Sequence, residues 1–180
     1  GSAFSPKNAA ADTPSNGWGH PGGAGHGSGA YAAGGGGGAG SIGEDASNDN
    51  AGDGGQGMQL PATFRNPASP VGAPGPTDTS THNPGWTGID DSGKFWVAGG
   101  GGGSHYYSDD TGGFGGIGTP AGGTGPFAGA GNGSRIMNDG GAALQNTGSG
   151  GGGMERNTPA PTVVNSGQGG SGLVLIAYPT

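Results

Sequence analysis

The chain has 180 residues, of which 51 are glycine, and only 28% of the sequence is hydrophobic. A layered core of Leu, Ile, Val and Phe cannot be built from this composition, because glycine has no side chain to bury. The net charge is −7 and the five Lys and Arg residues are scattered, which excludes the basic patch that nucleic acids and anionic membranes require. The absence of cysteine excludes disulfides and thiolate metal sites.

Glycine is concentrated in tracts that alternate with segments of different composition. Residues 1–29 form a glycine- and proline-rich segment, which we expect to continue from a longer chain, and residues 30–180 form one glycine-rich domain with variable inserts. α-Helix is not expected, because glycine costs about 1 kcal/mol relative to alanine in a helix interior. No apolar run approaches the ~20 residues of a membrane-spanning helix. The tracts extend over residues 22–29, 34–40, 52–57, 99–103, 112–118, 122–133, 148–153 and 167–172.

Two segments have the character of short strands. Residues 95–98, Phe-Trp-Val-Ala, precede five consecutive glycines, and residues 173–178 are apolar almost throughout. An apolar run of this length is typical of a strand that is buried on both faces or sealed against a partner chain. We therefore expect a C-terminal β-strand at residues 173–178.

The glycine tracts can exist in two states. Backbone entropy favours flexible coil, whereas the ordered alternative is a left-handed extended helix with three residues per turn. Such helices lack Cβ atoms, so they can pack closely and direct their N–H and C=O groups at neighbouring tracts. A central helix must be nearly pure glycine, as residues 99–103 are, while Phe114 and Ile117 would share one side of a peripheral helix. Only 9% of residues are charged, unlike typical disordered chains.

We therefore expect an ordered, irregular glycine-rich fold. It should consist of bundled polyglycine II helices with long loops and a few short β-strands, and with little or no α-helix.

Several segments resemble the glycine-rich domains of phage structural proteins. The similarity begins at the five glycines after Ala98 with the insert His105-Tyr106-Tyr107, and includes residues 59–67. It ends in residues 169–179, which look like the terminus of glycine-rich proteins in marine phages and cyanophages. Over residues 30–180 the chain resembles the polyglycine-sandwich adhesins at the tips of T-even-type long tail fibres. The resemblance implies that the tracts pack as a helical sandwich whose loops bind host surface receptors.

No motif indicates an enzyme or a cofactor. Ser171 lies in a glycine-rich stretch that leads into the predicted C-terminal strand, whereas the nucleophile of a hydrolase elbow follows a strand and precedes a helix. No lysine follows a glycine run as a phosphate-binding loop requires, and no Gly-x-Gly-x-x-Gly match opens a helix. We expect neither catalytic activity nor a bound cofactor.

A cluster of acidic residues is a weak candidate for metal binding. Carboxylate oxygens at this density can hold calcium, but the spacing of an EF-hand is absent, and a solvated acidic loop is the favoured interpretation. We do not expect a metal. The candidate ligands are Asp45, Asp49 and Asp53, with Glu44 beside them.

Aromatic side chains are the strongest candidates for recognition, because they supply rigid contact area and are frequent among interface hot spots. The candidate receptor-binding residues lie in segments between or beside the tracts: His105, Tyr106, Tyr107, Trp86 and Trp18. Packing or assembly is the expected role of Phe95, Trp96, Leu173, Val174, Leu175, Ile176 and Tyr178.

The leading hypothesis is a non-enzymatic, extracellular virion protein, namely a phage tail-fibre or fibre-tip adhesin that binds a bacterial surface protein or glycan. Other fibre subunits are the expected partners, with a homotrimer as one arrangement. The alternative is a structural virion or filament subunit in which residues 173–178 and the tracts mediate assembly. A third hypothesis, an ice-binding protein, requires a flat array of small residues, and the irregular inserts argue against it.

Overall fold

The computed structural model describes residues 19–27, 32–47, 50–66, 71–72, 95–105, 129–134, 138–154, 163–176 and 178. These residues contain two β-strands, β1 (Met58–Gln59) and β2 (Trp96–Val97), and one 3-10 helix, η1 (Ala62–Phe64). They contain no α-helix, and within them no helix is long and apolar enough to cross a membrane. β2 confirms the short strand predicted within residues 95–98.

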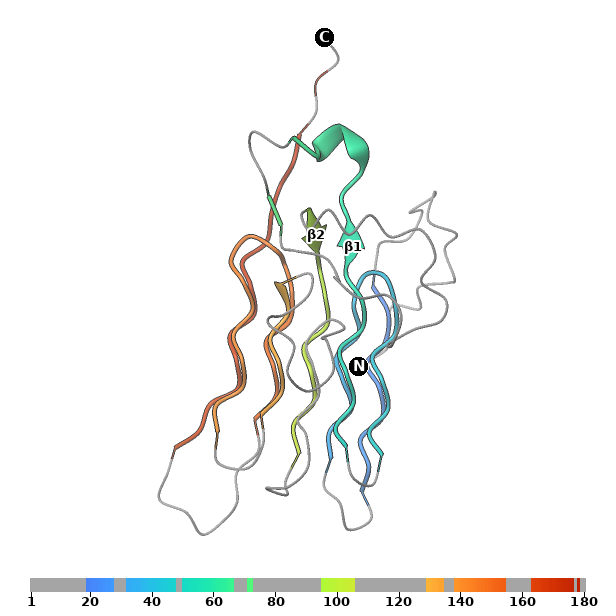
Figure 1. Ribbon diagram of the computed structural model, residues 1–180, viewed down its shortest axis with the longest axis vertical. Coiled ribbons are helices and arrows are strands. Elements are labelled where there is room, and N and C mark those ends of the chain that lie inside the picture. The colour runs from blue at the N-terminus through green and yellow to red at the C-terminus, as the bar shows by residue number, and fades with distance from the viewer. Residues whose placement is uncertain are drawn as a thin grey trace.

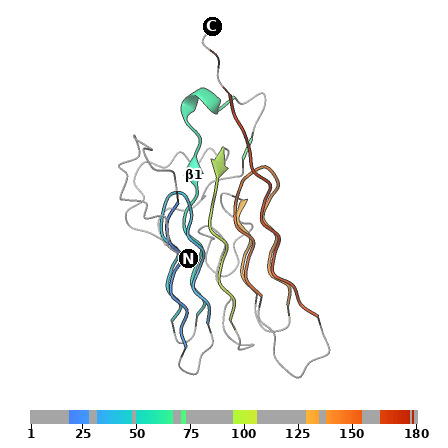
Figure 2. The ribbon, with the colours of Figure 1, turned by 180° about the vertical axis from the view of Figure 1, so that it is seen from behind.

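Most of the described chain consists of extended segments that run side by side along the long axis of the molecule (Figures 1 and 2). Segment 19–27 pairs with segment 32–40 through bonds of 2.7–2.9 Å that recur at every third residue. The N–H groups of His20, Gly23 and His26 donate to the carbonyl groups of Gly38, Gly35 and Ala32. Every third N–H group of segment 19–27 therefore points at the same neighbour, segment 32–40.

The same interval recurs throughout the bundle, and successive residues are bonded to different neighbours. In segment 32–40, every third residue from Ala33 donates to segment 95–105, while Gly35 and Gly38 donate to segment 41–47. Carbonyl groups of the same segment accept from segments 19–27 and 50–57. Some of these neighbours are parallel and others antiparallel. One segment therefore has hydrogen-bonded neighbours within its own layer and in a second layer.

These pairings arrange the segments in two layers. Each segment of the second layer bonds to two adjacent segments of the first, as segment 50–57 does with segments 32–40 and 95–105. In spatial order the first layer consists of segments 19–27, 32–40, 95–105, 147–154 and 163–171, and the second of segments 41–47, 50–57, 129–134 and 138–144.

Glycine permits the close approach of the two layers. A Cβ atom at Gly35 would overlap the Asp53 carbonyl oxygen, and one at Gly152 would overlap the Asn132 carbonyl oxygen. The interior is consequently made mainly of backbone, and most side chains buried among it are small, such as Ala32 and Ala130; His105 is the largest that is fully buried. The core thus depends on the absence of side chains rather than on their packing.

Aromatic side chains close one end of the bundle. β1 and β2 pair antiparallel there, with Met58 opposite Val97 and Gln59 opposite Trp96 (Figure 1). Phe95 and Trp96 are buried, with 8% and 7% of their surface exposed. This two-residue sheet therefore carries two buried aromatic side chains. We call this the strand end of the bundle.

The C-terminal strand predicted at residues 173–178 is not formed. Residues 173–176 and Tyr178 are not in a strand, residues 172–176 make no backbone hydrogen bond to another described residue, and Val174 is 85% exposed. The prediction was wrong because a strand needs a neighbour. The adjacent segment turns back at residues 145–147, and the last bond to it runs from the Gly148 N–H to the Ser171 carbonyl, 2.9 Å away.

Candidate functional site

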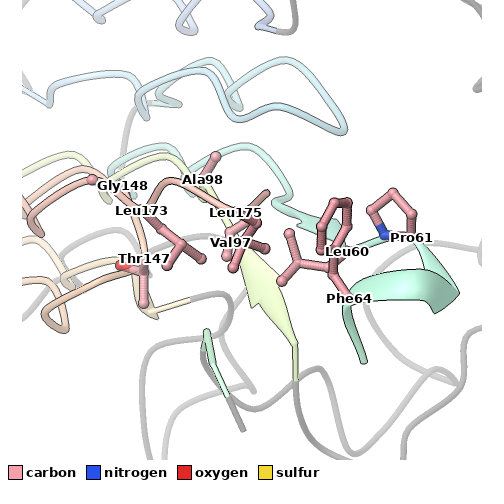
Figure 3. Close-up of a pocket in the computed structure, with 10 residues that line it drawn as sticks. Leu60, Pro61, Phe64, Val97, Ala98, Thr147, Gly148, Leu173 and Leu175 are labelled. Atoms are coloured by element: carbon pink, nitrogen blue, oxygen red, sulfur yellow. The ribbon is translucent and has the colours of Figure 1, made fainter. Parts of the chain in front are cut away.

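An apolar groove with a volume of about 430 Å³ lies at the strand end. Figure 3 shows side chains from the η1 region, from β2 and from the C-terminal segment converging on it. Its lining is formed by Leu60, Pro61, Phe64, Val97, Ala98, Thr147, Gly148, Gly172, Leu173 and Leu175.

The turn after β1 forms one wall of the groove. The Leu60 N–H donates to the Phe95 carbonyl (2.8 Å), which extends the pairing of β1 with β2 by one residue. Pro61 then precedes η1, where the Phe64 N–H donates to the Pro61 carbonyl (2.9 Å). Proline fixes its own φ and suits the start of such a turn. The Arg65 Nε–H donates back to the Leu60 carbonyl, so Leu60 and Phe64 are held toward Val97 (Figure 3).

A hydrogen-bonded turn at residues 145–147 supports the groove. The Thr147 hydroxyl donates to the Leu144 carbonyl (2.7 Å), and the Thr147 carbonyl accepts from the Ala98 N–H (2.8 Å). Asn146 has a φ of 60°, a left-handed conformation that asparagine tolerates better than most residues. The Asn146 N–H donates to the Ser171 hydroxyl (2.8 Å), and that hydroxyl donates to Asn146 Oδ1 (3.1 Å). These bonds attach the C-terminal segment to the turn.

The C-terminal segment forms the other wall and has two different faces. Leu173 and Leu175 are half-buried and line the groove. Val174, Ile176 and Tyr178 alternate with them and are 85%, 67% and 79% exposed. Side chains that alternate in this way belong to an extended backbone. The segment therefore presents one apolar row to the body of the protein and a second apolar row to solvent.

The chemistry of the groove favours contact with apolar groups. Its lining includes the hydroxyl of Thr147 but no Asp, Glu, His, Lys or Arg, and that hydroxyl already donates to Leu144. The lining therefore supplies no general acid, general base or metal ligand of the kinds that catalysis commonly uses. A hydrocarbon group or an apolar side chain is the complement of this surface.

The structure corrects the prediction that His105 contacts a receptor. Its side chain is fully buried, with 0% exposed surface, because residue 105 is still part of the bundle. Its N–H donates to the Ser134 carbonyl (3.1 Å), and it forms an antiparallel bridge with Ala32. His105 lies just after the glycine tract 99–103. The neighbouring glycines have no side chains, which leaves space for its imidazole ring. The other candidate receptor-binding residues, Tyr106, Tyr107, Trp86 and Trp18, lie outside the described residues.

The side chains of Phe95 and Trp96 are buried beside the β1–β2 pair, and their role in assembly stays a prediction. Among the predicted assembly residues, Leu173 and Leu175 lie against the groove, whereas Val174, Ile176 and Tyr178 face away from it. Leu60, Pro61 and Phe64 line the groove but are not among the site residues predicted from the sequence. The signal available in the sequence was Leu60 and Phe64, two large apolar residues on either side of Pro61. This pattern is typical of a short turn whose apolar side chains pack against a neighbouring segment.

The acidic residues of the weak metal candidate bind backbone N–H groups. Asp45 Oδ1 accepts from the Ala24 N–H, and Glu44 Oε2 accepts from the Asp53 N–H (3.3 Å). Asp49 lies outside the described residues. Within the described ranges no three His, Asp or Glu residues come close enough together to hold a metal ion. Carboxylates at these positions tie neighbouring segments together.

A scan against protein-family models, a search of curated proteins and a search of solved structures found no match to this chain.

Proposed function

We propose that the extended segments are polyglycine II helices. In a β-strand, side chains and backbone bonds repeat every two residues and neighbours lie in one plane. Here the donors recur every three residues, and one segment bonds to neighbours in two layers. A repeat of three residues is that of the left-handed extended helix. The positions at which a Cβ would overlap backbone atoms of a neighbour, such as Gly35 and Gly101, also support this proposal.

We further propose that this scaffold belongs to a non-enzymatic phage tail-fibre or fibre-tip adhesin on the virion surface. The observation that carries the proposal is a row of bonded residues that crosses the bundle at the end opposite the strand end. Bridges and backbone bonds of this row connect His26, Ala32, His105, Ser134 and Gly153. We call it the insert end.

Several inserts begin within two residues of this row. They are the sequence segments 28–31, 106–128, 135–137 and 155–162. Segment 73–94, by contrast, begins and ends at the strand end, between Gly72 and Phe95. A rigid scaffold that presents sequence segments at its ends is a common design for recognition. The proposed partner is a bacterial surface protein or glycan, which the aromatic residues of such inserts would contact.

Tyr106 and Tyr107 provide the sharpest test, because they immediately follow the buried His105. Fluorescently labelled, unmodified chain is first added to a panel of bacterial strains to find a strain that binds it. Binding of the unmodified chain and of each variant to that strain is then measured by flow cytometry. The double substitution Tyr106→Ala, Tyr107→Ala should weaken binding by about 30-fold or more, as loss of a hot-spot residue does.

Tyr178→Ala is the matched control, because it removes an exposed tyrosine at the strand end and should leave adsorption unchanged. Equal adsorption by all three proteins contradicts recognition through the insert that contains Tyr106 and Tyr107.

The alternative function, a structural subunit of a virion or filament, is favoured by a different observation. Val174, Ile176 and Tyr178 form an exposed apolar row, and such rows mark association surfaces. A purely structural subunit would lose assembly when this row is altered but would show no adsorption that depends on Tyr106 and Tyr107.

A further inference from the structure

We propose that residues 172–176 form a hinged strap, which opens and closes over the apolar groove while the bundle stays folded. Gly172 is the pivot, and the closed state is the one in which Leu173 and Leu175 line the groove. In the open state the strap moves away and uncovers the opposite wall around Leu60. The proposal concerns the strand end and does not depend on receptor binding at the insert end.

The first argument is that the backbone of the strap is not bonded to the bundle. The last backbone bond to this part of the chain runs from the Gly148 N–H to the Ser171 carbonyl (2.9 Å), and the Asn146 N–H donates to the Ser171 hydroxyl (2.8 Å). Beyond Ser171, residues 172–176 make no backbone hydrogen bond to another described residue. Segments with few buried contacts and no protected backbone bonds open at a much lower free energy than a core does.

The second argument is the freedom of the backbone at Gly172. A Cβ atom there would have no atom within 4 Å, whereas one at Gly170 would overlap the Leu144 carbonyl oxygen. The chain is therefore confined at Gly170 and unconfined at Gly172. A hinge is a short stretch that absorbs a change in φ and ψ, and glycine has access to more backbone conformations than any other residue. The pivot of the strap therefore lies at Gly172.

The third argument is that side-chain contacts hold the strap closed. Leu173 and Leu175 are half-buried and line the groove together with Val97 and Phe64 (Figure 3). The groove keeps a volume of about 430 Å³, so this contact is looser than a close-packed interior, where voids rarely exceed the size of a water molecule. Two half-buried leucines in such a contact supply a small share of the stability of a whole domain. We expect the open state to be populated at about 0.1–10%, the usual range of a minor conformation.

The strap controls how much of the apolar wall is accessible. The Leu60 N–H is bonded to Phe95, Phe64 belongs to η1 and Val97 belongs to β2, so this wall stays in place when the strap moves. Opening converts a groove with two walls into an open apolar face of the bundle. A segment of the chain itself therefore determines when an apolar group can reach that face.

Methyl relaxation dispersion on the full-length chain tests this motion, because the NMR method reports exchange on the µs–ms timescale. The methyl groups of the strap residues Leu173 and Leu175 and of the wall residues Leu60 and Val97 should share one exchange process with one minor population. Val164 is the matched reporter, because it is a buried residue of segment 163–171 with 7% of its surface exposed. It should show no exchange.

Double substitutions on the two faces of the strap provide the second measurement. Leu173→Ala with Leu175→Ala removes apolar contact from the groove and should raise the ratio of open to closed chain about 10-fold or more, as reported by the two wall residues. Val174→Ala with Ile176→Ala is the matched control, because these side chains are 85% and 67% exposed. The control should change the ratio less than about twofold.

Absence of exchange at Leu60 and Val97 overturns the proposal. Equal exchange at Val164 also overturns it, because the whole bundle would then open rather than the strap. Equal effects of the two double substitutions are a third result that contradicts it. Slow exchange of the Gly100 amide, which donates to the Gly55 carbonyl (2.8 Å), verifies that each variant is folded.

Discussion

Replacing Gly35 with alanine would place a methyl group where the two layers touch. Gly35 is buried in segment 32–40, and a Cβ at this position would overlap the Asp53 carbonyl oxygen of the second layer. The Gly35 N–H donates to the Glu44 carbonyl (2.9 Å), and the Gly35 carbonyl accepts from the Gly23 N–H (2.7 Å). To relieve the overlap, segments 32–40 and 50–57 must separate, and this displacement weakens the two bonds from the Gly52 and Gly55 N–H groups to the Ala33 and Gly36 carbonyls (3.0 and 2.7 Å).

The expected loss of stability follows from these two effects. Overpacking of a close-packed interior costs about 1–3 kcal/mol, and each of the two weakened hydrogen bonds contributes about 1 kcal/mol. Gly35→Ala should therefore reduce the free energy of unfolding by about 3–5 kcal/mol, a large share of the ~5–15 kcal/mol of a typical domain. For a chain of this size the melting temperature should fall by about 6–20 °C.

Gly27→Ala is the matched control for this measurement. A Cβ at Gly27 would have no atom within 4 Å, so alanine there should be neutral or stabilise the fold by about 0.4–1 kcal/mol through the unfolded state. Differential scanning calorimetry of the two variants and of the unmodified chain gives the comparison. If Gly35→Ala and Gly27→Ala melt within about 2 °C of each other, the close packing of backbone against backbone is refuted.

Three further predictions concern other parts of the bundle. The Gly100 amide, which donates to the Gly55 carbonyl (2.8 Å), should exchange with deuterium far more slowly than the exposed amide of Gly169; uniform fast exchange, measured by NMR, would contradict an ordered bundle. Trp96→Ala should lower the free energy of unfolding by about 3–5 kcal/mol in urea titrations, because a buried indole is removed, and a loss below 1 kcal/mol would disagree. Ser171→Ala should cost about 1–2 kcal/mol by leaving Asn146 without its two bonds to the Ser171 hydroxyl, whereas alanine at the exposed Ser166 should change little.

The central position of residues 99–103 could be predicted from the sequence. Five consecutive glycines suit a place with neighbours on all sides, and all five residues are buried in the structure. Their hydrogen bonds reach segments 32–40, 50–57, 129–134 and 147–154. The prediction succeeded because only glycine, which has no side chain, fits where neighbouring backbones approach closely on all sides.

His105 shows where this kind of reasoning fails. A histidine between a glycine run and two tyrosines has the composition of an exposed loop, yet its backbone continues the bundle and bonds to Ser134. Nothing local marks where a tract stops, because the bonds that hold it come from segments far away in sequence. The C-terminal strand failed for the related reason that an apolar pattern indicates a strand but not whether a neighbour lies beside it.

The composition alone predicted that neither a layered core of large apolar side chains nor α-helix would form, since both depend on side chains that glycine lacks; the described residues contain no α-helix. Only the tertiary structure decided which segments are neighbours and that the groove forms from Leu60, Val97 and Leu175. The physical reason is that the N–H and C=O groups of one glycine tract are chemically the same as those of any other. The order of the layers must therefore come from the connections and from the few side chains at their ends.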